Sequence, residues 1–489
     1  MNTYLLSQLP LLTGFGLLLV LASVWPQGAK KTASKGVESA SQFITLLALA
    51  LSAWLTHELL IPGDEFFGGA IRVTVIGQAL SYGALALAFI ATLLSGEYLQ
   101  KIHVRSGDFR LLILAQALGL YHLPLAGDLA TLFIAFELVS VPSYVLAGFN
   151  HRDARANEAG MKYLLLGAFA SVLFLLGLAF LYGATGEILL ADIQGKISLY
   201  LIHADTANLL LAKVSLGLLI AALLFKVASA PFHLWLPDVY QGTNLASLSF
   251  IASPVKVAIF GLIALLLWGP FASMQGLWKP LILVAAFACA LFGNFQAIAQ
   301  TRLKRLLAFS TVANAGFILL SLFLDSASAF LFYVMTYGLT SIGLIACFMA
   351  LGTRTADLDE VDDLNGLGRR HPWIAGALTF MLFSLAGIPL TAGFAAKFSV
   401  ASGAFLPGYQ PAAWFLPVLV ASIVLSLVSF FFYFKIVRAL WLQPEPATDS
   451  LSAPEPRALG FNALFVAAIV AIALLVMGIV MHMPTMPVS

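Results

Sequence analysis

The sequence predicts an all-α polytopic membrane protein with about fourteen transmembrane helices, arranged as two inverted five-helix repeats with broken helices. Three observations predict this fold. Of the 489 residues, 61% are hydrophobic and only 10% are charged, whereas a soluble protein carries about 25% charged residues. Apolar runs of about 20 residues, the length that crosses a bilayer, recur along the chain. Several runs carry a proline near an ionisable residue, as in "LFKVASAPFH".

The apolar runs place fourteen spans in the chain. The first run has no basic residue before it and is too long for the core of a signal peptide, so we expect a retained helix. The fourth run is short and the twelfth is long. The spans are expected near residues 4–25, 41–60, 73–95, 110–126, 128–149, 159–183, 208–230, 244–268, 278–298, 304–323, 327–351, 372–402, 412–440 and 459–481.

Lysine and arginine residues in the short loops predict the orientation, because they concentrate on the cytoplasmic side of a membrane. The odd-numbered connections hold 16 of these residues and the even-numbered connections hold 4. We therefore expect the odd connections to face the cytoplasm and both termini to lie outside. Residues 231–243 have no basic residue, so we expect this connection to fold back into the protein. The basic residues of the odd connections include Lys30, Lys31, Arg105, Arg110, Arg354 and Arg457.

Spans 4–8 and 9–13 form two sets of five, and two successive copies of an odd number of spans face opposite ways in the membrane. Spans 7 and 12 take equivalent places in the two sets, and each holds a proline and a lysine. Two connections, 187–205 and 357–370, fit surface helices. The expected parts are an N-terminal three-helix segment (1–109), a first inverted repeat (110–270), a second inverted repeat (271–441) and a C-terminal helix (442–489).

Five ionisable residues fall inside the expected membrane region or near its edge. A buried charge costs roughly 2.5–3.5 kcal/mol on insertion scales, so such residues usually serve a function. Long lysine side chains near helix ends can instead snorkel to the surface, which is the alternative for Lys162 and Lys226. The others could serve only as polar contacts between helices. The five residues are Glu137, Lys162, Lys226, Lys256 and Lys397.

Two of these residues stand five positions before a proline: Glu137 before Pro142, and Lys226 before Pro231. A proline removes the hydrogen bond to the carbonyl four residues earlier. Pro231 therefore frees the carbonyl of Val227, which is the neighbour of Lys226. Irregular backbone is tolerated in a membrane only where it is buried in protein or lines a wet cavity. Broken helices that carry charges near the midplane predict a transport site.

Pro389 loosens span 12 upstream of Lys397 in the same way. The chemistry that these residues suit is proton relay, because burial makes a lysine release its proton more readily and a nearby carboxylate reverses the effect. Glu137 and Lys162 could form such a pair across spans 5 and 6. Moving or hydrating the glutamate would then switch the lysine between holding and releasing a proton.

Further polar side chains could extend the relay through water, although a simple hydrogen bond between helices is the alternative for each of them. His233 and Asp238 could cap the broken helix of span 7 or gate a cytoplasmic entrance, and the sequence does not decide between these roles. The polar candidates are Tyr144, Ser229, His233, Asn244, Ser253, Asn294, Gln296, Thr311, Asn314, Thr336, Tyr337 and Thr340.

The sequence gives no indication of a cofactor bound by this chain. Its two cysteines, Cys289 and Cys347, cannot ligate an iron–sulfur cluster alone, and no C-x-x-C pair occurs. The histidines show no helical pair spaced for haem or metal. No G-x-x-x-x-G-K-[ST] or G-x-G-x-x-G loop for nucleotide phosphates is present. The net charge of +2 is too small to indicate nucleic acid.

Five motifs resemble the N subunit of respiratory NADH:quinone oxidoreductase, complex I. They fall on the corresponding spans in the family's order, and the likeness covers nearly the whole chain from about span 3 to span 14. The resemblance implies fourteen helices with two inverted five-helix halves. The motifs are "FELVSVPSYVLAGF" (136–149), "EAGMKYLLLGAFAS" (158–171), "PFHLWLPDVYQG" (231–242), "FGNFQAIAQTRLKRLLAFST" (292–311) and "LAGIPLTAGFAAKF" (385–398).

The resemblance also implies a role for each charged residue. Glu137 matches the family's span-5 glutamate and Lys226 its span-7 lysine. Lys256 matches the span-8 lysine of a connecting channel, Lys397 the span-12 lysine that faces the outer side, and Lys162 a further span-6 lysine. Protons would enter from the cytoplasm, pass along a central polar axis and leave outside, driven by quinone reduction in partner subunits.

The same resemblance implies the location and the partners. The chain would lie in a bacterial inner membrane beside M-, K-, J- and A-type subunits, with no nucleic acid. NADH, flavin, iron–sulfur clusters and quinone would bind in partner subunits. The sequence itself shows no site for NADH or quinone.

Three relatives of the superfamily compete with this assignment. The M subunit is expected to carry a glutamate where this chain has Lys397, and the L subunit is expected to be longer, with a lateral helix after span 14. The D-type subunit of the multisubunit sodium/proton antiporter also carries a span-12 lysine, and it is the main alternative. It is expected to have an alanine–histidine pair where this chain has Val239 and Tyr240. A membrane anchor without transport activity is a further alternative.

Two departures from the family pattern concern the polar axis. The family usually opens span 8 with an alanine–proline–x–proline run, whereas this chain has "TNLASLSF" there and a later proline, Pro254. The start of span 8 and the entry path could therefore differ. In span 10, Asn314 stands where the family often has a histidine, and an asparagine can pass a proton only by holding water.

Overall fold

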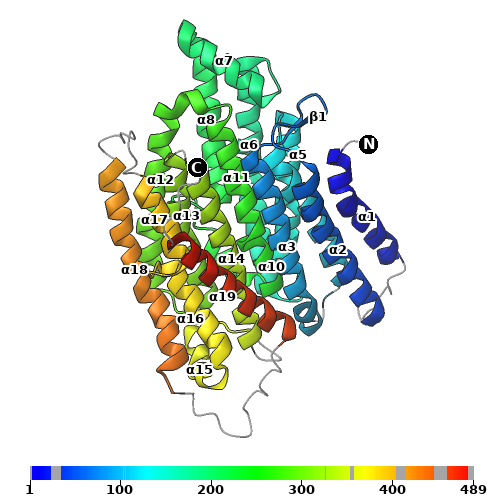
Figure 1. The fold of residues 1–489 in the computed structure, drawn as a ribbon, viewed down its shortest axis with the longest axis vertical. Helices are drawn as coiled ribbons and strands as arrows, with labels where there is room; N and C mark the ends of the chain where they lie inside the picture. The colour runs from blue at the N-terminus through cyan, green and yellow to red at the C-terminus, as the bar shows by residue number, and fades with distance from the viewer. Residues whose placement is uncertain are drawn as a thin grey trace. The chain divides into compact units, whose positions relative to one another are not determined.

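The structure is a computed structural model, and it is helical as the sequence predicts (Figure 1). In the part of the chain that it describes, twelve helical segments are long and apolar enough to cross a membrane, and one of them, Leu245–Trp268, is interrupted at Ser253. The fourth expected span is a 17-residue helix, α4 (Ser106–His122), and the twelfth is divided between two short helices. The number of fourteen spans and the inverted repeats stay predictions. The described residues are 3–23, 35–102, 104, 106–324, 326–352, 357–403, 415–444 and 460–482.

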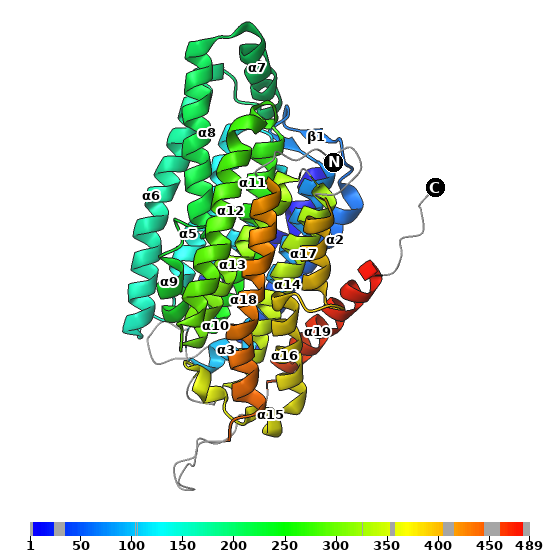
Figure 2. The same ribbon diagram turned by 90° about the vertical axis from the view of Figure 1, so that its left-hand side faces the viewer.

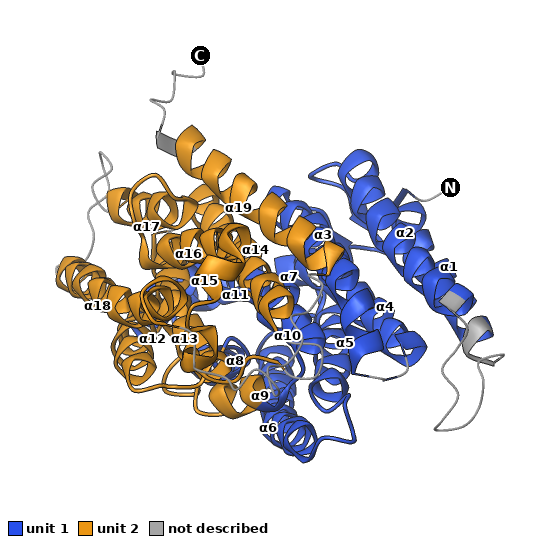
Figure 3. Ribbon diagram, turned by 90° about the horizontal axis from the view of Figure 1, so that it is seen from below, with its two compact units in different colours: residues 1–227, 242–281 blue, residues 228–241, 282–489 orange. Residues whose placement is uncertain are grey.

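The chain divides into two compact units, coloured blue and orange in Figure 3. Unit 1 comprises Met1–Val227 and Gly242–Leu281, and unit 2 comprises Ala228–Gln241 and Ile282–Ser489. The units are defined by packing and not by repeat symmetry, so they do not test the expected repeats. Of the basic loop residues named above, Lys30, Lys31, Arg105, Arg354 and Arg457 lie outside the described residues.

Unit 1 is a helical bundle with one short β-hairpin among its described residues, formed by β1 (Glu65–Phe66) and β2 (Ile71–Arg72). Its helices are α1 (Thr3–Ser23), α2 (Lys35–Leu59), α3 (Val75–Lys101), α4 (Ser106–His122), α5 (Leu129–Ala147), α6 (Ala154–Thr185), α7 (Leu190–His203), α8 (Thr206–Lys226), α10 (Leu245–Ala252) and α11 (Pro254–Trp268).

Close helix pairs in unit 1 depend on small residues. At Gly119 of α4, an added Cβ would lie 2.7 Å from the backbone nitrogen of Val139 in α5. At Gly177 of α6, an added Cβ would lie 2.7 Å from Cγ of Leu219 in α8. Only glycine allows these approaches, so α5, which carries Glu137, and α8, which carries Lys226, are held in fixed registers.

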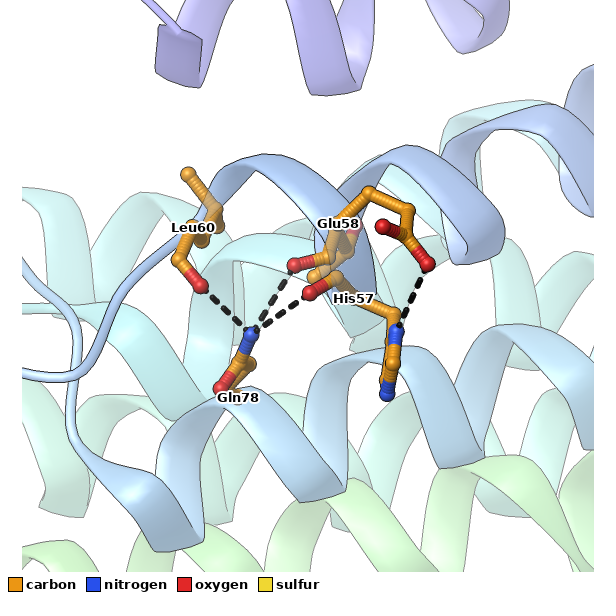
Figure 4. Close-up of polar contacts among 5 residues, drawn as sticks. His57, Glu58, Leu60 and Gln78 are labelled. Atoms are coloured by element: carbon orange, nitrogen blue, oxygen red, sulfur yellow. Dashed lines mark hydrogen bonds and ion pairs between the residues drawn. The ribbon is translucent and has the colours of Figure 1, made fainter.

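Helix ends in unit 1 are capped by polar side chains. The amide nitrogen of Gln78 in α3 donates to the carbonyls of Thr56 (3.1 Å), His57 (3.3 Å) and Leu60 (2.6 Å) at the end of α2 (Figure 4). The last carbonyls of a helix have no partner within it, so such a donor is needed away from water. This contact fixes the end of α2 against α3.

A helix forms within the expected range 187–205 as α7, which connects the end of α6 to the start of α8 (Figure 2). Its Tyr200 hydroxyl donates to the carbonyl of Ala184 in α6, at 2.9 Å.

The prediction of a surface helix over residues 357–370 is wrong, because no single helix covers this range. Two short turns, η3 (Val361–Leu364) and α15 (Leu367–Arg370), form there, because Gly366 between them has a φ of 75°.

Arg110 also differs from its expected place in a cytoplasmic loop. It lies in the first turns of α4 and is only 1% exposed. Its guanidinium donates to the carbonyl of Glu38 at 2.9 Å and to the hydroxyl of Ser41, both in α2. Arg110 therefore joins two helices, and it cannot serve as a free loop cation.

Unit 2 packs its described helices around α13 and α14, and α14 contacts α16, α17 and α19. The expected twelfth span ends its first half at Ala386, and Gly387 caps that half with a φ of 88°. The helices of this unit are α9 (Leu236–Gly242), most of α12 (Gln275–Ile298), α13 (Leu303–Phe323), α14 (Ala327–Leu351), α15, α16 (Pro372–Ala386), α17 (Ala392–Gly403), α18 (Phe415–Trp441) and α19 (Phe461–His482).

Candidate functional site

The break predicted in span 7 is present, and it begins directly after the lysine. Helix α8 ends at Lys226, Val227 is its C-cap, and Ala228 has a φ of 55°. Pro231, whose peptide bond is cis, cannot continue the helix, and α9 begins only at residue 236. Because α8 stops before Val227, the carbonyls at its open end include that of Lys226 itself. The unit boundary falls at the same place in the chain.

Lys226 lies in a pocket of hydroxyls and aromatic rings supplied by α5. Its Nζ donates to Ser140 Oγ at 2.9 Å and to the hydroxyl of Tyr144. The same atom lies 4.8 Å from the centre of the Phe136 ring and 4.7 Å from that of Tyr144. These three residues are spaced four apart, so they form one face of α5. Gly167 of α6 leaves room for the Tyr144 ring, since an added Cβ would lie 2.5 Å from its hydroxyl.

Glu137 is the charged neighbour of this pocket. Its carboxylate is close enough to Lys226 to act on the ammonium electrostatically. One carboxylate oxygen, Oε1, is buried and has no hydrogen-bond partner among the described residues. The predicted ion pair between Glu137 and Lys162 is wrong. Lys162 Nζ instead lies 2.7 Å from Oε1 of Glu158, one turn away on α6, and its side chain is 41% exposed.

Lys256 extends the site along unit 1. It is 1% exposed, and its Nζ donates to the carbonyl of Lys226 at 3.3 Å. The carbonyl end of a helix carries partial negative charge, which favours an ammonium group there. Lys226 and Lys256 therefore both lie at the open end of α8, one as its last residue and the other as a donor to it.

The break predicted in span 12 is present in unit 2, between α16 and α17. Lys397 of α17 donates from Nζ to the carbonyls of Leu385 (2.8 Å) and Ala386 (3.2 Å), the last two residues of α16. Its Nζ also lies 5.1 Å from the centre of the Phe317 ring of α13. Lys397 thus occupies the same kind of place as Lys256, at the carbonyl end of a helix interrupted within the membrane.

His233 and Asp238 hold the segment after the span-7 break against other helices of unit 2. His233 Nε2 lies 2.9 Å from Oε1 of Gln296 in α12, and Asp238 Oδ1 lies 2.6 Å from Nη1 of Arg305 in α13. Residues 231–243 are largely buried, as expected for a segment that folds back into the protein. These contacts support an anchoring role at the break, and Cys289 adds to it by accepting from the backbone nitrogen of Ala230 at 3.1 Å.

Asn314 lies between two tyrosines in unit 2. Its Nδ2 lies 3.4 Å from the hydroxyl of Tyr433 in α18, and its Oδ1 accepts from Tyr333 in α14 at 3.3 Å. The Tyr333 ring stacks on Phe317, the ring beneath Lys397. A chain of polar and aromatic contacts therefore runs from Asn314 to Lys397. Three further polar residues of this region, Ser310, Thr311 and Tyr337, are also buried.

The structure thus brings the predicted residues together in two groups, and Lys162 joins neither through the contacts described. Sequence reasoning missed Phe136, Ser140, Cys289 and Tyr433. The first two carried a usable signal, because they stand four and eight residues before Tyr144 on the span that holds Glu137. Cys289 and Tyr433 had no such signal, since their partners come from distant parts of the sequence.

Comparison with known proteins identifies the family to which this chain belongs. The model of the family described as NADH:quinone oxidoreductase/Mrp antiporter, TM, matches residues 126–437. The NADH-quinone oxidoreductase subunit N 1 of Herpetosiphon aurantiacus is 35% identical over 383 residues, which are 78% of this chain and 76% of that protein.

Solved structures show the same fold. A chain of respiratory complex I from Thermus thermophilus superposes with a TM-score of 0.76 at 30% identity, covering 97% of both chains. A chain of the Mrp complex from a Dietzia species gives a TM-score of 0.76 at 20% identity, covering 98% of this chain and 95% of that one. The latter likeness shows the fold alone. The chain belongs to the NADH:quinone oxidoreductase/Mrp antiporter transmembrane family, and its curated relatives are named subunit N of NADH-quinone oxidoreductase.

Proposed function

We propose that this chain is the proton-translocating N subunit of a bacterial NADH:quinone oxidoreductase. The observation that carries the proposal is the placement of two buried lysines and one half-buried lysine at the carbonyl ends of interrupted membrane helices. Lys226 and Lys256 lie at the end of α8, and Lys397 lies at the end of α16. Intramembrane ionisable residues at broken helices are typical of ion pathways.

In the proposed mechanism, Glu137 and Lys226 form the first exchange pair. When the carboxylate of Glu137 approaches Lys226, it stabilises the ammonium, and when it withdraws, the lysine can release its proton. The hydroxyls of Ser140 and Tyr144 hold the ammonium in the meantime. Lys256 would then pass the proton onward, and Lys397 would release it.

The polar residues of unit 2 are proposed as accessory groups. His233 and Asp238 would hold the segment at the break while its neighbours move, and Asn314 would hold water between Tyr333 and Tyr433. Lys162, paired with Glu158, is proposed as a more peripheral group that supplies protons from the surface.

The orientation belongs to the same proposal. The excess of basic residues in odd-numbered connections supports an orientation with those connections in the cytoplasm and both termini outside a bacterial inner membrane. Protons would move from the cytoplasm to the outside. NADH, flavin, iron–sulfur clusters and quinone would be bound by partner subunits, and the M-, K-, J- and A-type subunits would be the membrane neighbours.

The test is to replace Lys226, Lys256 and Lys397 singly by alanine and to measure proton pumping by the assembled complex in proteoliposomes. We expect each variant to assemble, to pump at a strongly reduced rate and to retain electron transfer from NADH in uncoupled membranes. Lys196→Ala is the matched control, because Lys196 lies on α7 with a 44% exposed side chain. Normal pumping by all three variants would contradict the relay and favour a membrane anchor.

The alternative within the family is a D-type subunit of a multisubunit sodium/proton antiporter. The matched family includes both NADH:quinone oxidoreductase and Mrp antiporter subunits. The two functions differ in their driving force. Pumping that requires NADH and quinone and does not require sodium would support the proposed function, whereas proton movement driven by a sodium gradient without NADH would support the antiporter.

A further inference from the structure

The eighth span is interrupted at a point that the charged residues alone did not reveal. Its apolar run, Leu245–Trp268, is long enough for one membrane helix, but the structure contains two helices, α10 and α11. Ser253 between them has a φ of −119° and a ψ of −87°. Pro254 explains the break, since a proline has no N–H and its ring collides with the carbonyl four residues earlier. That carbonyl belongs to Phe250.

Pro254 also makes a buried helix start possible. The first N–H groups of a helix have no partner within it, and an unpaired N–H buried away from water is costly. Proline at the first helical position removes one of these donors and has the backbone angle that a helix needs. The next bond of α11 is already in place, because Val257 N donates to the carbonyl of Ser253 at 3.1 Å.

The break determines where Lys256 stands. With α11 beginning at Pro254, Lys256 is its third residue and lies in the first turn, where the helix end carries partial positive charge. An ammonium is disfavoured there by its own helix. It is favoured at the carbonyl end of α8, where Lys256 Nζ donates to the carbonyl of Lys226 at 3.3 Å. The two helix ends therefore act in opposite directions on the Lys256 ammonium, which the start of α11 disfavours and the open end of α8 favours.

We propose that Pro254 is a positioning residue for proton transfer, which ends α10 so that Lys256 reaches the open end of α8. This inference rests on the proposed function and adds a residue to it. In a continuous helix, Lys256 would lie three turns inside the span, away from any helix start. Its ammonium would lose the field of the α11 terminus, and its backbone would follow a different path past α8.

The test compares Pro254→Ala with Pro280→Ala in the complete complex reconstituted in proteoliposomes. Pro280 is a matched control, because it also lies inside a membrane helix, α12, and that helix carries none of the proposed relay lysines. We measure protons pumped per NADH oxidised and, separately, electron transfer in uncoupled vesicles. Pro254→Ala should lower the proton ratio at least about threefold with electron transfer retained, and Pro280→Ala should change neither quantity.

A double-mutant cycle separates positioning from a structural role. If Pro254 acts through Lys256, adding Pro254→Ala to Lys256→Ala should cause no further loss of pumping. A further loss in that background, or normal pumping by Pro254→Ala, would overturn the inference. Pro254→Ser is the second variant. If neither Pro254 variant assembles, the inference is also overturned, because proline would then be needed for folding. Normal pumping by Lys256→Ala would instead contradict the proposed function itself.

Discussion

The two interrupted helices that end beside lysines, α8 in unit 1 and α16 in unit 2, hold their ammonium groups by different means. Lys226 is the last residue of its helix and turns away from the chain break to hydroxyls and rings of α5. Lys397 lies after the break between α16 and α17, and its side chain reaches back to donate to the carbonyls of Leu385 and Ala386. One lysine is held by side chains of a neighbouring helix and the other by backbone.

This difference indicates a division of roles. Side-chain hydroxyls can rotate and exchange partners, and the Glu137 carboxylate acts electrostatically on the Lys226 ammonium. None of the ion pairs among the described residues involves Lys397. In the proposed relay, the Lys226 site would therefore switch with a neighbouring charge, whereas the Lys397 site offers fixed carbonyls. The four variants below, one of them a double substitution, test this comparison from the largest expected effect to the smallest.

Glu137→Gln tests the switching charge, and we expect it to have the largest effect. The glutamine keeps the shape but removes the negative charge that stabilises the Lys226 ammonium. Pumping should fall about tenfold or more, since each 1.4 kcal/mol of lost stabilisation changes a rate about tenfold. Proton uptake by proteoliposomes during NADH oxidation measures the effect. Pumping at the normal rate by the intact complex would contradict the proposal that the Glu137 charge controls Lys226.

Ser140→Ala combined with Tyr144→Phe tests the hydroxyl partners of Lys226. Hydrogen bonds to charged groups contribute about 1.5–3 kcal/mol each, although water can replace part of this. We expect the pumping rate to fall about three- to tenfold, with assembly retained. Tyr200→Phe is the control, since Tyr200 donates only to the Ala184 carbonyl at the surface of unit 1. An equal loss in the control would mean that the effect is not specific to Lys226.

Phe317→Leu tests the aromatic contact of Lys397. A cation–π contact contributes about 0.5–2 kcal/mol, and the carbonyls of Leu385 and Ala386 remain to hold the ammonium. Pumping should therefore fall only about twofold to fivefold, less than after the loss of both hydroxyls at Lys226. The same proteoliposome assay applies. A loss larger than that of the Ser140/Tyr144 double variant would contradict the assignment of the backbone as the main partner of Lys397.

Glu158→Gln tests the exposed ion pair with Lys162, and we expect the smallest effect. Exposed ion pairs contribute about 0.2–1 kcal/mol, and both side chains are well exposed in this chain, at 41% for Lys162 and 64% for Glu158. The pumping rate should change less than about twofold. The Tm of the complex should change by less than about 2 °C. A large loss of pumping would show that Lys162 and its ion pair are needed for proton transfer, which contradicts a peripheral role.

The helical architecture could be predicted from the sequence because the apolar runs are long and regular. The breaks were harder. Pro142 and Pro231 stand at the same distance from a charged residue, yet α5 continues through Pro142 whereas α8 ends before Pro231. In α5, Ser143 donates to the carbonyl of Val139 at 2.6 Å, and so does the Gln116 amide at 3.3 Å. These bonds lie beside the carbonyl of Leu138, which Pro142 leaves without its helical partner, and an apolar run does not predict them.

The candidate site was predictable in its residues but not in its pairings. The charged residues stood out because they are rare in an apolar chain. Their partners did not, since Lys162 lies on the half-exposed face of α6 and pairs with Glu158 of its own helix. Arg110 was expected in a loop because it stands at the edge of an apolar run, but its donors reach α2. Such contacts depend on the rotation of each helix, which an apolar run does not specify.

The most direct test of the relay is to replace Lys226 and, separately, Lys397 by arginine. Arginine keeps the positive charge and the hydrogen-bond donors, but it does not release its proton in proteins. The quantity to measure is the number of protons pumped per NADH oxidised in proteoliposomes. We predict that both variants assemble and oxidise NADH in uncoupled vesicles with a clearly lower proton ratio. An unchanged ratio in both variants would show that these lysines hold the helices together without carrying protons.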